Sequence, residues 1–189
     1  MLAFYDLRRR NLRDAKPNAA HFALARLEDA LAKRGDSLTL VTQNIDDLHE
    51  RAGSWRVIHM HGELLKARCG RCEMVRPWVD DLTISDLCSN CGDAGALRTH
   101  VVWFGEMPLA LDLIDHALRK ADLFVAVGTS GAVYPAAGFV AEARAYGLRT
   151  CEINLEAADN AYLFDEQRLG PASETVPAWV EELVGGSAE

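Results

Sequence analysis

Four cysteines stand in two close pairs that could hold one metal ion. The pairs are Cys69-Gly-Arg-Cys72 and Cys88-Ser-Asn-Cys91, with fifteen residues between them. Each tight turn can bring two thiolates to one ion, and two such turns complete the closed tetrahedron of a structural zinc site. We therefore predict one structural zinc ion on these cysteines. Free buried thiols or redox pairs are the alternative, but the segment has too few apolar residues for a core without metal. The fifth cysteine, Cys151, is expected to be a small buried hydrophobe.

Two histidines, His59 and His61, follow a short apolar stretch and could supply a general base. Imidazole has an unperturbed pKa of about 6.5, so it can accept a proton near neutral pH. Alternate residues of an extended strand face the same side, so both rings are expected on one side. His61 precedes Gly62 and is the better candidate. A hydrogen-bonded structural histidine is the alternative for each.

Short polar clusters follow three apolar stretches and could bind one ligand together. Taken singly, each cluster is also typical of a turn, because Asn, Ser, Thr and Gly are common turn residues. If the stretches are parallel strands, however, their carboxyl ends converge on one crevice. The clusters are Gln43-Asn44-Ile45-Asp46, Gly128-Thr129-Ser130 and Asn154-Leu155-Glu156.

The elements that must position these residues alternate between strand and helix patterns, which predicts an α/β fold with a doubly wound parallel sheet. Pro17 and Asn18 begin one helix and Gly35 ends it. Residues 66–97 lose all periodicity, so they are expected to form a small zinc-ribbon insert in a domain made of residues 1–65 and 98–189. The other expected strands cover residues 37–42, 57–59, 99–104, 123–127 and 150–154, and the other helices 45–52, 108–120, 135–145 and 177–184.

Composition excludes several classes of protein. The 189 residues are 49% hydrophobic and 25% charged, as in ordinary globular domains. The net charge is -8, and the one compact basic run is Arg8 to Arg10 with Arg13, which argues against a nucleic-acid partner. The longest apolar stretch falls far short of the roughly 18 residues of a membrane span, and no signal segment follows Met1. We expect a cytoplasmic protein that binds neither nucleic acid nor membranes.

Taken in order along nearly the whole chain, these motifs resemble those of the sirtuin family. Tyr5 and Arg8 add the Tyr-x-x-Arg pair of bacterial class III sirtuins, which take acidic acyl groups from lysine. The shared motifs are Thr42-Gln-Asn-Ile-Asp46, His59-Met-His-Gly62, the two cysteine pairs, Val102-Trp-Phe-Gly-Glu106, Gly128-Thr-Ser130 and Asn154-Leu-Glu156.

The resemblance implies NAD-dependent removal of acetyl, succinyl or malonyl groups from protein lysine, giving nicotinamide and O-acyl-ADP-ribose. The family residue that matches His61 is the general base, which takes a proton from a ribose hydroxyl. The residues implied to contact the cofactor are Gln43, Asn44, Ile45, Asp46, Gly128, Thr129, Ser130, Asn154, Leu155, Glu156 and Ala172.

The same resemblance implies how the acyl-lysine substrate is held. Phe104 would line the tunnel for the lysine stem, and Tyr5 with Arg8 would clamp an acyl carboxylate, which a guanidinium contacts through paired charge-assisted hydrogen bonds. The alternative to the clamp is that Arg8 belongs to a solvated basic run. The alternative for residues 101–105 is an ordinary core strand. The residues implied to pair as a strand with the substrate backbone run from Val101 and Val102 through Phe104 to Gly105.

The sequence departs from the family pattern at its start. Sirtuins begin with a strand and a Gly-Ala-Gly turn that receives the NAD pyrophosphate, and this chain contains no such turn. We therefore expect a truncated, Rossmann-like fold without the first strand-helix unit, with two exposed strand edges and weakened NAD binding. Two alternatives stay open: an acyl-lysine peptide-binding module that holds zinc without turnover, and a protein ADP-ribosyltransferase using the same site.

Overall fold

The parallel strands form two small sheets in the computed structural model, which describes residues 1–185. In the first sheet β1 (Leu40–Thr42) pairs with β2 (Val57–His59). In the second, β7 (Arg149–Asn154) lies between β6 (Leu123–Val127) and β8 (Glu166–Leu169). Every pairing in these two sheets is parallel. The expected parallel α/β architecture is therefore confirmed.

Strands β1 and β6 each leave one edge without a partner strand among residues 1–185. All five apolar residues of β6 are only half-buried. A strand in the interior of a parallel sheet is covered on both faces and paired on both edges. The parallel strands of residues 1–185 are therefore divided between two sheets.

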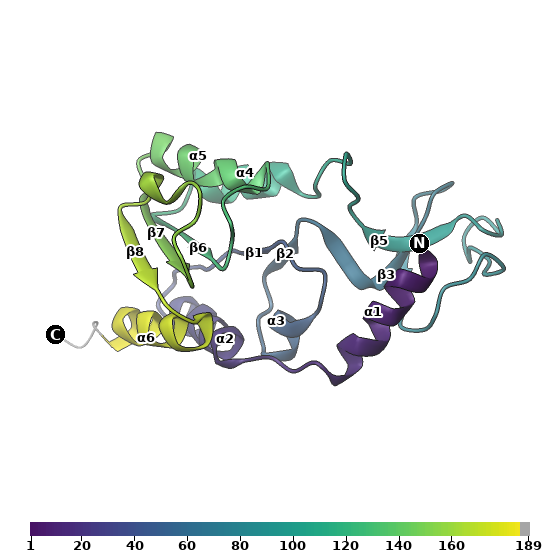
Figure 1. Ribbon diagram of the computed structural model, residues 1–189, viewed down its shortest axis with the longest axis horizontal. Coiled ribbons are helices and arrows are strands. Elements are labelled where there is room, and N and C mark those ends of the chain that lie inside the picture. The colour runs from purple at the N-terminus through teal and green to yellow at the C-terminus, as the bar shows by residue number, and fades with distance from the viewer. Residues whose placement is uncertain (186–189) are drawn as a thin grey trace.

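Helices cover both faces of the β6–β8 sheet (Figure 1). On one side α2 (Ala19–Lys33) and α6 (Ala172–Gly185) form a core with Cys151 and Ile153 of β7. On the other side lie α4 (Leu111–Leu118) and α5 (Phe139–Ala145), whose core includes Met60 just beyond β2. Cys151 is buried, as expected for a small hydrophobe. Two short 3-10 turns complete this part, at Ala136–Gly138 and Ala161–Leu163.

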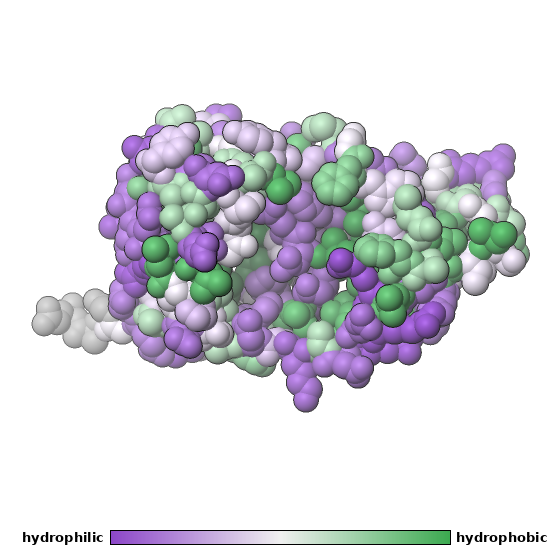
Figure 2. All heavy atoms as spheres, viewed as in Figure 1, coloured by the Kyte–Doolittle hydropathy of each residue, from purple (hydrophilic) through white to green (hydrophobic). Residues whose placement is uncertain are grey.

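An antiparallel sheet and the first helix form the other end of the molecule (Figure 1). In this sheet β3 (Gly62–Cys69) lies between β4 (Val75–Pro77) and β5 (Leu97–Val101). Helix α1 (Leu2–Asp14) packs against β3 and β5. Figure 2 shows a hollow on this face of the molecule between the β6–β8 side and the β3–β5 side. The sequence patterns did not predict α1, β3, β4 or β8.

Several expected elements begin or end elsewhere because other hydrogen bonds use their backbone. The helix expected over 45–52 is α3 (Leu48–Arg51), since the Ile45 carbonyl accepts the Leu64 N–H (2.7 Å) instead. The helix expected from residue 108 begins at Leu111, because Leu109 donates to the Met60 carbonyl. The last helix begins at residue 172 and carries Pro177 in its interior.

Membrane-crossing segments were also sought among the helices. Within residues 1–185, none combines the length and the hydrophobicity that a bilayer crossing requires.

Candidate active site and metal centre

His61 occupies a two-residue turn between β2 and β3, where its ring is fixed by one hydrogen bond. Its Nδ1 lies 3.1 Å from the backbone oxygen of Gln43. A carbonyl oxygen can only accept, so Nδ1 carries the proton and donates, which leaves a lone pair on Nε2. The following Gly62 has φ +83°, and a Cβ there would stand 2.1 Å from the His100 carbonyl oxygen. Only glycine lets the chain turn this closely, so Gly62 helps to fix the position of His61.

The neighbouring His59 has a different partner. Its Nε2 contacts Glu50 Oε1 at 2.6 Å, and its side chain is buried. The extended conformation expected for residues 59 to 61 is not found, because β2 ends at His59 and the chain turns at Met60 and His61. The two imidazoles therefore have different partners. Of the two, only His61 forms a hydrogen bond to the segment after β1.

That segment, residues 43–46, is also held by hydrogen bonds between backbone N–H groups and nearby side chains. The Asn44 N–H donates to Thr42 Oγ1 (3.1 Å), and the Asp46 carboxylate accepts the Leu48 N–H (3.1 Å) at the start of α3. The Asn44 side chain is exposed at the carboxyl end of β1. Asp46 thus has a structural partner already, whereas Asn44 is open to a ligand.

The other two polar clusters meet each other at the carboxyl ends of β6 and β7. Asn154 Nδ2 donates to the Thr129 carbonyl oxygen at 2.7 Å, and the Gly128 N–H donates to that of Ile153 at 3.0 Å. Gly128 has φ +61°, with open space where a Cβ would be. The side chains of Ser130, Leu155 and Glu156 are exposed. Ala172, at the start of α6, is half-buried and packs beside the core at β7.

The site residues are therefore brought together as two groups. Hydrogen bonds join His61 to residue 43 in one sheet and Asn154 to residue 129 in the other. Both groups lie at the carboxyl ends of parallel strands, where open α/β sheets bind ligands.

The strand expected to continue to residue 104 ends at Val101. Val101 pairs with Gly62 and is buried, and the Val102 N–H donates to the His61 carbonyl oxygen. Beyond this point Glu106 accepts the Trp103 N–H (2.9 Å) and closes a turn. The predicted end of this strand at Phe104 is wrong, because the turn replaces ladder pairing beyond Val101. Phe104 is fully exposed.

Tyr5 and Arg8 lie one turn apart on α1. Tyr5 is half-buried and its ring meets that of Phe4 edge to face, with centroids 5.2 Å apart. The Arg8 guanidinium lies 4.9 Å from the Phe4 ring centroid and is exposed. Within residues 1–185 it makes no ion pair, unlike its neighbours Arg9 and Arg10. Arg8 is thus a cation open to an anionic ligand.

The four paired cysteines converge as the sequence predicts. Their sulfur atoms all lie within 4.8 Å of one another, with Cys69 Sγ 3.7 Å from Cys91 Sγ and Cys72 Sγ 3.6 Å from Cys88 Sγ. Tetrahedral bonds of about 2.3 Å from zinc to sulfur place the sulfurs about 3.8 Å apart, so the cluster fits a zinc ion. Four ligands fill the tetrahedron and leave no position for a substrate.

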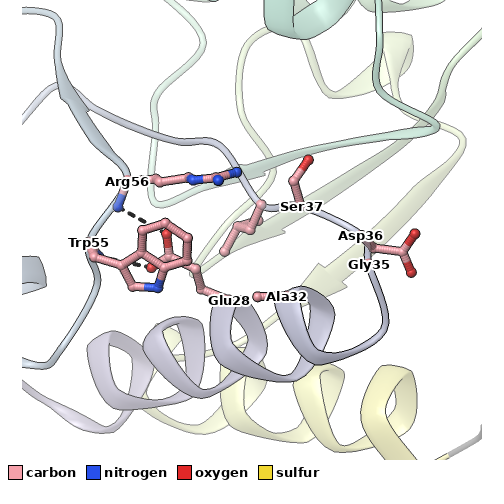
Figure 3. Close-up of a pocket in the computed structure, with 8 residues that line it drawn as sticks. Glu28, Ala32, Gly35, Asp36, Ser37, Trp55 and Arg56 are labelled. Carbon is pink, nitrogen blue, oxygen red and sulfur yellow. Dashed lines mark hydrogen bonds between the residues drawn. The ribbon is translucent and has the colours of Figure 1, made fainter.

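A separate hollow lies at the opposite, amino ends of β1 and β2 (Figure 3). It encloses about 240 Å³, and none of the predicted site residues lines it. Glu28 of α2 is buried here, and its carboxylate accepts the N–H groups of Trp55 (3.0 Å) and Arg56 (2.9 Å). Sequence analysis missed this role, although a charged residue beside Leu27 on the apolar stripe of α2 was a signal. Glu28 fixes the start of β2, the strand that leads to His61.

The chain was then compared with known proteins. The model of the Sir2 family matches residues 2–135. An NAD-dependent protein deacylase of Caulobacter vibrioides is 62% identical over 181 residues, which are 96% of this chain and 76% of that protein.

Solved structures agree with this relationship. A mutant Sir2 homologue in complex with ADP-ribose superposes with a TM-score of 0.88 at 35% identity, covering 100% of this chain and 75% of that one. Sir2 bound to an acetylated peptide superposes with a TM-score of 0.74 at 30% identity, covering 93% and 74%. The chain therefore belongs to the Sir2 family.

Proposed function

We propose that this chain removes acyl groups from protein lysine in an NAD-dependent reaction. Acyl-lysine, NAD and water give lysine, nicotinamide and O-acyl-ADP-ribose. The observation that carries the proposal is the hydrogen bond from His61 Nδ1 to the Gln43 carbonyl, which leaves Nε2 free as a base beside an open polar segment. The names of the deacylase relative and of the complexes with ADP-ribose and with acetylated peptide support it.

His61 is proposed as the general base. When bound, NAD would supply the anomeric carbon that accepts the acyl oxygen as nicotinamide leaves. Nε2 of His61 would accept the proton of a ribose hydroxyl, so that this oxygen can bond to the acyl carbon. Water would then add to the acyl carbon as its bond to the lysine nitrogen breaks. The Gln43 carbonyl holds the ring orientation during this transfer and stabilises the imidazolium through the Nδ1–H donor.

The exposed strand tips are proposed to hold the cofactor. Asn44 and Asp46 would contact the ribose and nicotinamide region, and Asp46 also accepts the N–H that begins α3. Further along the cofactor, a ligand could approach the backbone of Gly128, which has open space beside its Cα, and the exposed hydroxyl of Ser130. The remaining proposed contacts are Gln43, Ile45, Thr129, Asn154, Leu155, Glu156 and Ala172.

The substrate is proposed to bind beside β5. Val101 ends β5, and Val102 follows it with a hydrogen bond to His61. An extended peptide bound beside these two residues would place its acyl-lysine near the base. Phe104 and Gly105 would adjust to this peptide, since their turn is exposed. Tyr5 and Arg8 would bind the carboxylate of a succinyl or malonyl group. We further propose that the four cysteines bind one zinc ion and that residues 66–97 act as a metal-binding insert.

Product analysis tests the proposed reaction. The chain is incubated with NAD and a succinyl-lysine peptide, and the products are separated by chromatography and then identified and quantified by mass spectrometry. Free lysine peptide, nicotinamide and O-succinyl-ADP-ribose in equal amounts support deacylation. ADP-ribose attached to protein would instead indicate ADP-ribosyl transfer. Peptide binding without any of these products would indicate a binding module, and either result overturns the proposal.

A further inference from the structure

A buried ion pair anchors the inner face of α1. Arg9 is 1% exposed and donates to Asp6 Oδ1 (2.6 Å), one helical turn earlier. Its other two hydrogen bonds leave the helix, to the Leu64 carbonyl of β3 (3.0 Å) and to Thr99 Oγ1 of β5 (2.6 Å). One guanidinium thus ties α1 to both long strands of the antiparallel sheet.

A second anchor ties the same helix to the cysteine cluster. Asp6 Oδ1 also accepts the Leu82 N–H (3.0 Å), and Leu82 belongs to the hydrophobic core around Cys69 and Cys88. Leu2, in the first turn of α1, packs against that core as well. The helix is therefore fixed on two sides, by the sheet and by the metal-binding segment.

These anchors also determine where the neighbouring side of α1 points. Asp6 and Arg9 each follow one of the two residues proposed to contact the acyl carboxylate, Tyr5 and Arg8. Successive residues on a helix are separated by a fixed angle, so fixing the first pair fixes the direction of the second. By contrast, Arg10 pairs with Asp81 at the exposed surface, where solvent competes for both charges.

We propose that Asp6, Arg9 and Thr99 are positioning residues for acyl selection, because they hold α1 in the orientation that aims Arg8 at the carboxylate of the acyl group. This proposal rests on the proposed function, since it concerns the substrate class of the same site. A carboxylate contact depends steeply on the direction of the guanidinium, whereas an acetyl group makes no such contact. Loosening the anchor should therefore weaken binding of acidic acyl groups more than binding of acetyl groups.

The test measures the ratio of affinities for a succinyl-lysine and an acetyl-lysine peptide by fluorescence anisotropy, which requires no turnover. Thr99→Val removes one acceptor from Arg9 with little change of shape, and Thr99→Ser restores the hydroxyl. Asp6→Asn removes the charge but keeps an oxygen for Leu82. Arg10→Met, in the exposed pair on the same helix, is the matched control, and Arg8→Met defines the full effect of the clamp.

Thr99→Val and Asp6→Asn are expected to lower the succinyl-to-acetyl ratio by about threefold or more, as for the loss of part of a charge-assisted contact. Thr99→Ser and Arg10→Met should keep the wild-type ratio. If Arg8→Met lowers the ratio and neither anchor variant does, the positioning role is refuted while the proposed function stands. If Arg8→Met leaves the ratio unchanged, both the clamp and its positioning are refuted. Melting curves identify a variant that fails to fold. If one anchor variant does not fold, the ratio measured for the other decides whether the positioning role is refuted.

Discussion

At the scale of single residues, the site depends on contacts that leave selected atoms unsatisfied. His61 is held through Nδ1 and, within residues 1–185, Nε2 has no partner. In the same part of the chain Arg8 has no carboxylate partner, whereas Arg9 and Arg10 are both paired. Asn44 is exposed at the end of β1. A group that the fold leaves unpaired can bind a ligand without losing an internal hydrogen bond, so these residues are the strongest candidates for function.

The unpaired Arg8 gives the first prediction. Arg8→Met keeps the length of the side chain but removes the charge, so desuccinylation should fall by about tenfold or more while deacetylation changes little. The measurement is kcat/KM on a matched pair of succinyl and acetyl peptides. Arg10→Met, which breaks only an exposed ion pair, should leave both rates unchanged. An equal loss on both substrates in Arg8→Met would show that no carboxylate clamp exists.

A pair of histidines gives the second prediction. The rings of His21 (α2) and His49 (α3) lie 4.7 Å apart. Burial lowers the pKa of both, and each would repel the other when charged, while Asp46 favours the charged forms and Glu50 and His59 also face His49. A histidine whose folded pKa lies below its unfolded value of 6.5 takes up its proton more readily when unfolded. Its contribution to stability is therefore full above that value and is lost as the pH falls below it.

Urea unfolding at pH 7.5, 6.5 and 5.5 measures this effect. Stability of the wild type should fall towards pH 5.5, and the fall should be shallower in His49→Gln. His116→Gln, at an exposed position of α4, is the control and should follow the wild type. If the free energy of unfolding fell equally with pH in the wild type and in His49→Gln, the histidine pair would not be the cause of the pH dependence.

Sequence reasoning located His61 and Asn44 because each follows an apolar stretch typical of a strand, and it located Arg8 through the resemblance to sirtuins. It missed Arg9 and Glu28, since a buried charge is compensated by partners distant in the chain. Arg9 bonds Thr99, ninety residues away, and Glu28 bonds the backbone at residues 55 and 56. Nothing in the local sequence around either residue contains that information.

At the scale of elements, the sequence predicted those with strong local signals. The apolar strand β6 and the helix α2 were found closely, and Asn18 caps α2 through bonds to the N–H groups of Ala20 and His21. By contrast, β3 and β4 were missed because their stability comes from antiparallel pairing and from the cysteine cluster. Helix α1 was missed because its buried face is largely polar, with Asp6 and Arg9 beside Leu12.

The cysteine cluster allows a test at this scale. Cys69→Ala should release a zinc ion that wild type holds at one per chain, and amides of β3, β4 and β5 should exchange hydrogen faster, because a metal replaces the core that this segment lacks. Cys151→Ala is the control, since that thiol is buried beside α2 and α6, away from the cluster. The measurements are metal content by atomic absorption and hydrogen exchange. Retention of one zinc per chain in Cys69→Ala would contradict a four-thiolate site.

At the scale of the whole molecule, the proposed catalytic residues belong to different sheets. The 43–46 segment follows β1 and His61 follows β2. Residues 128–130 follow β6 and residues 154–156 follow β7. The alternation of strands and helices predicted this parallel architecture. A ligand that spans both groups would link the two halves of the site.

The most direct test of this account is the rate of O-acyl-ADP-ribose formation in wild type and in His61→Ala, measured in a single turnover with saturating NAD and succinyl-lysine peptide. Removal of the base should lower this rate by about a hundredfold or more, because a positioned general base contributes a factor of this size. Peptide affinity should remain that of the wild type, since the imidazole does not bind the acyl-lysine. An unchanged rate in His61→Ala would contradict the central claim.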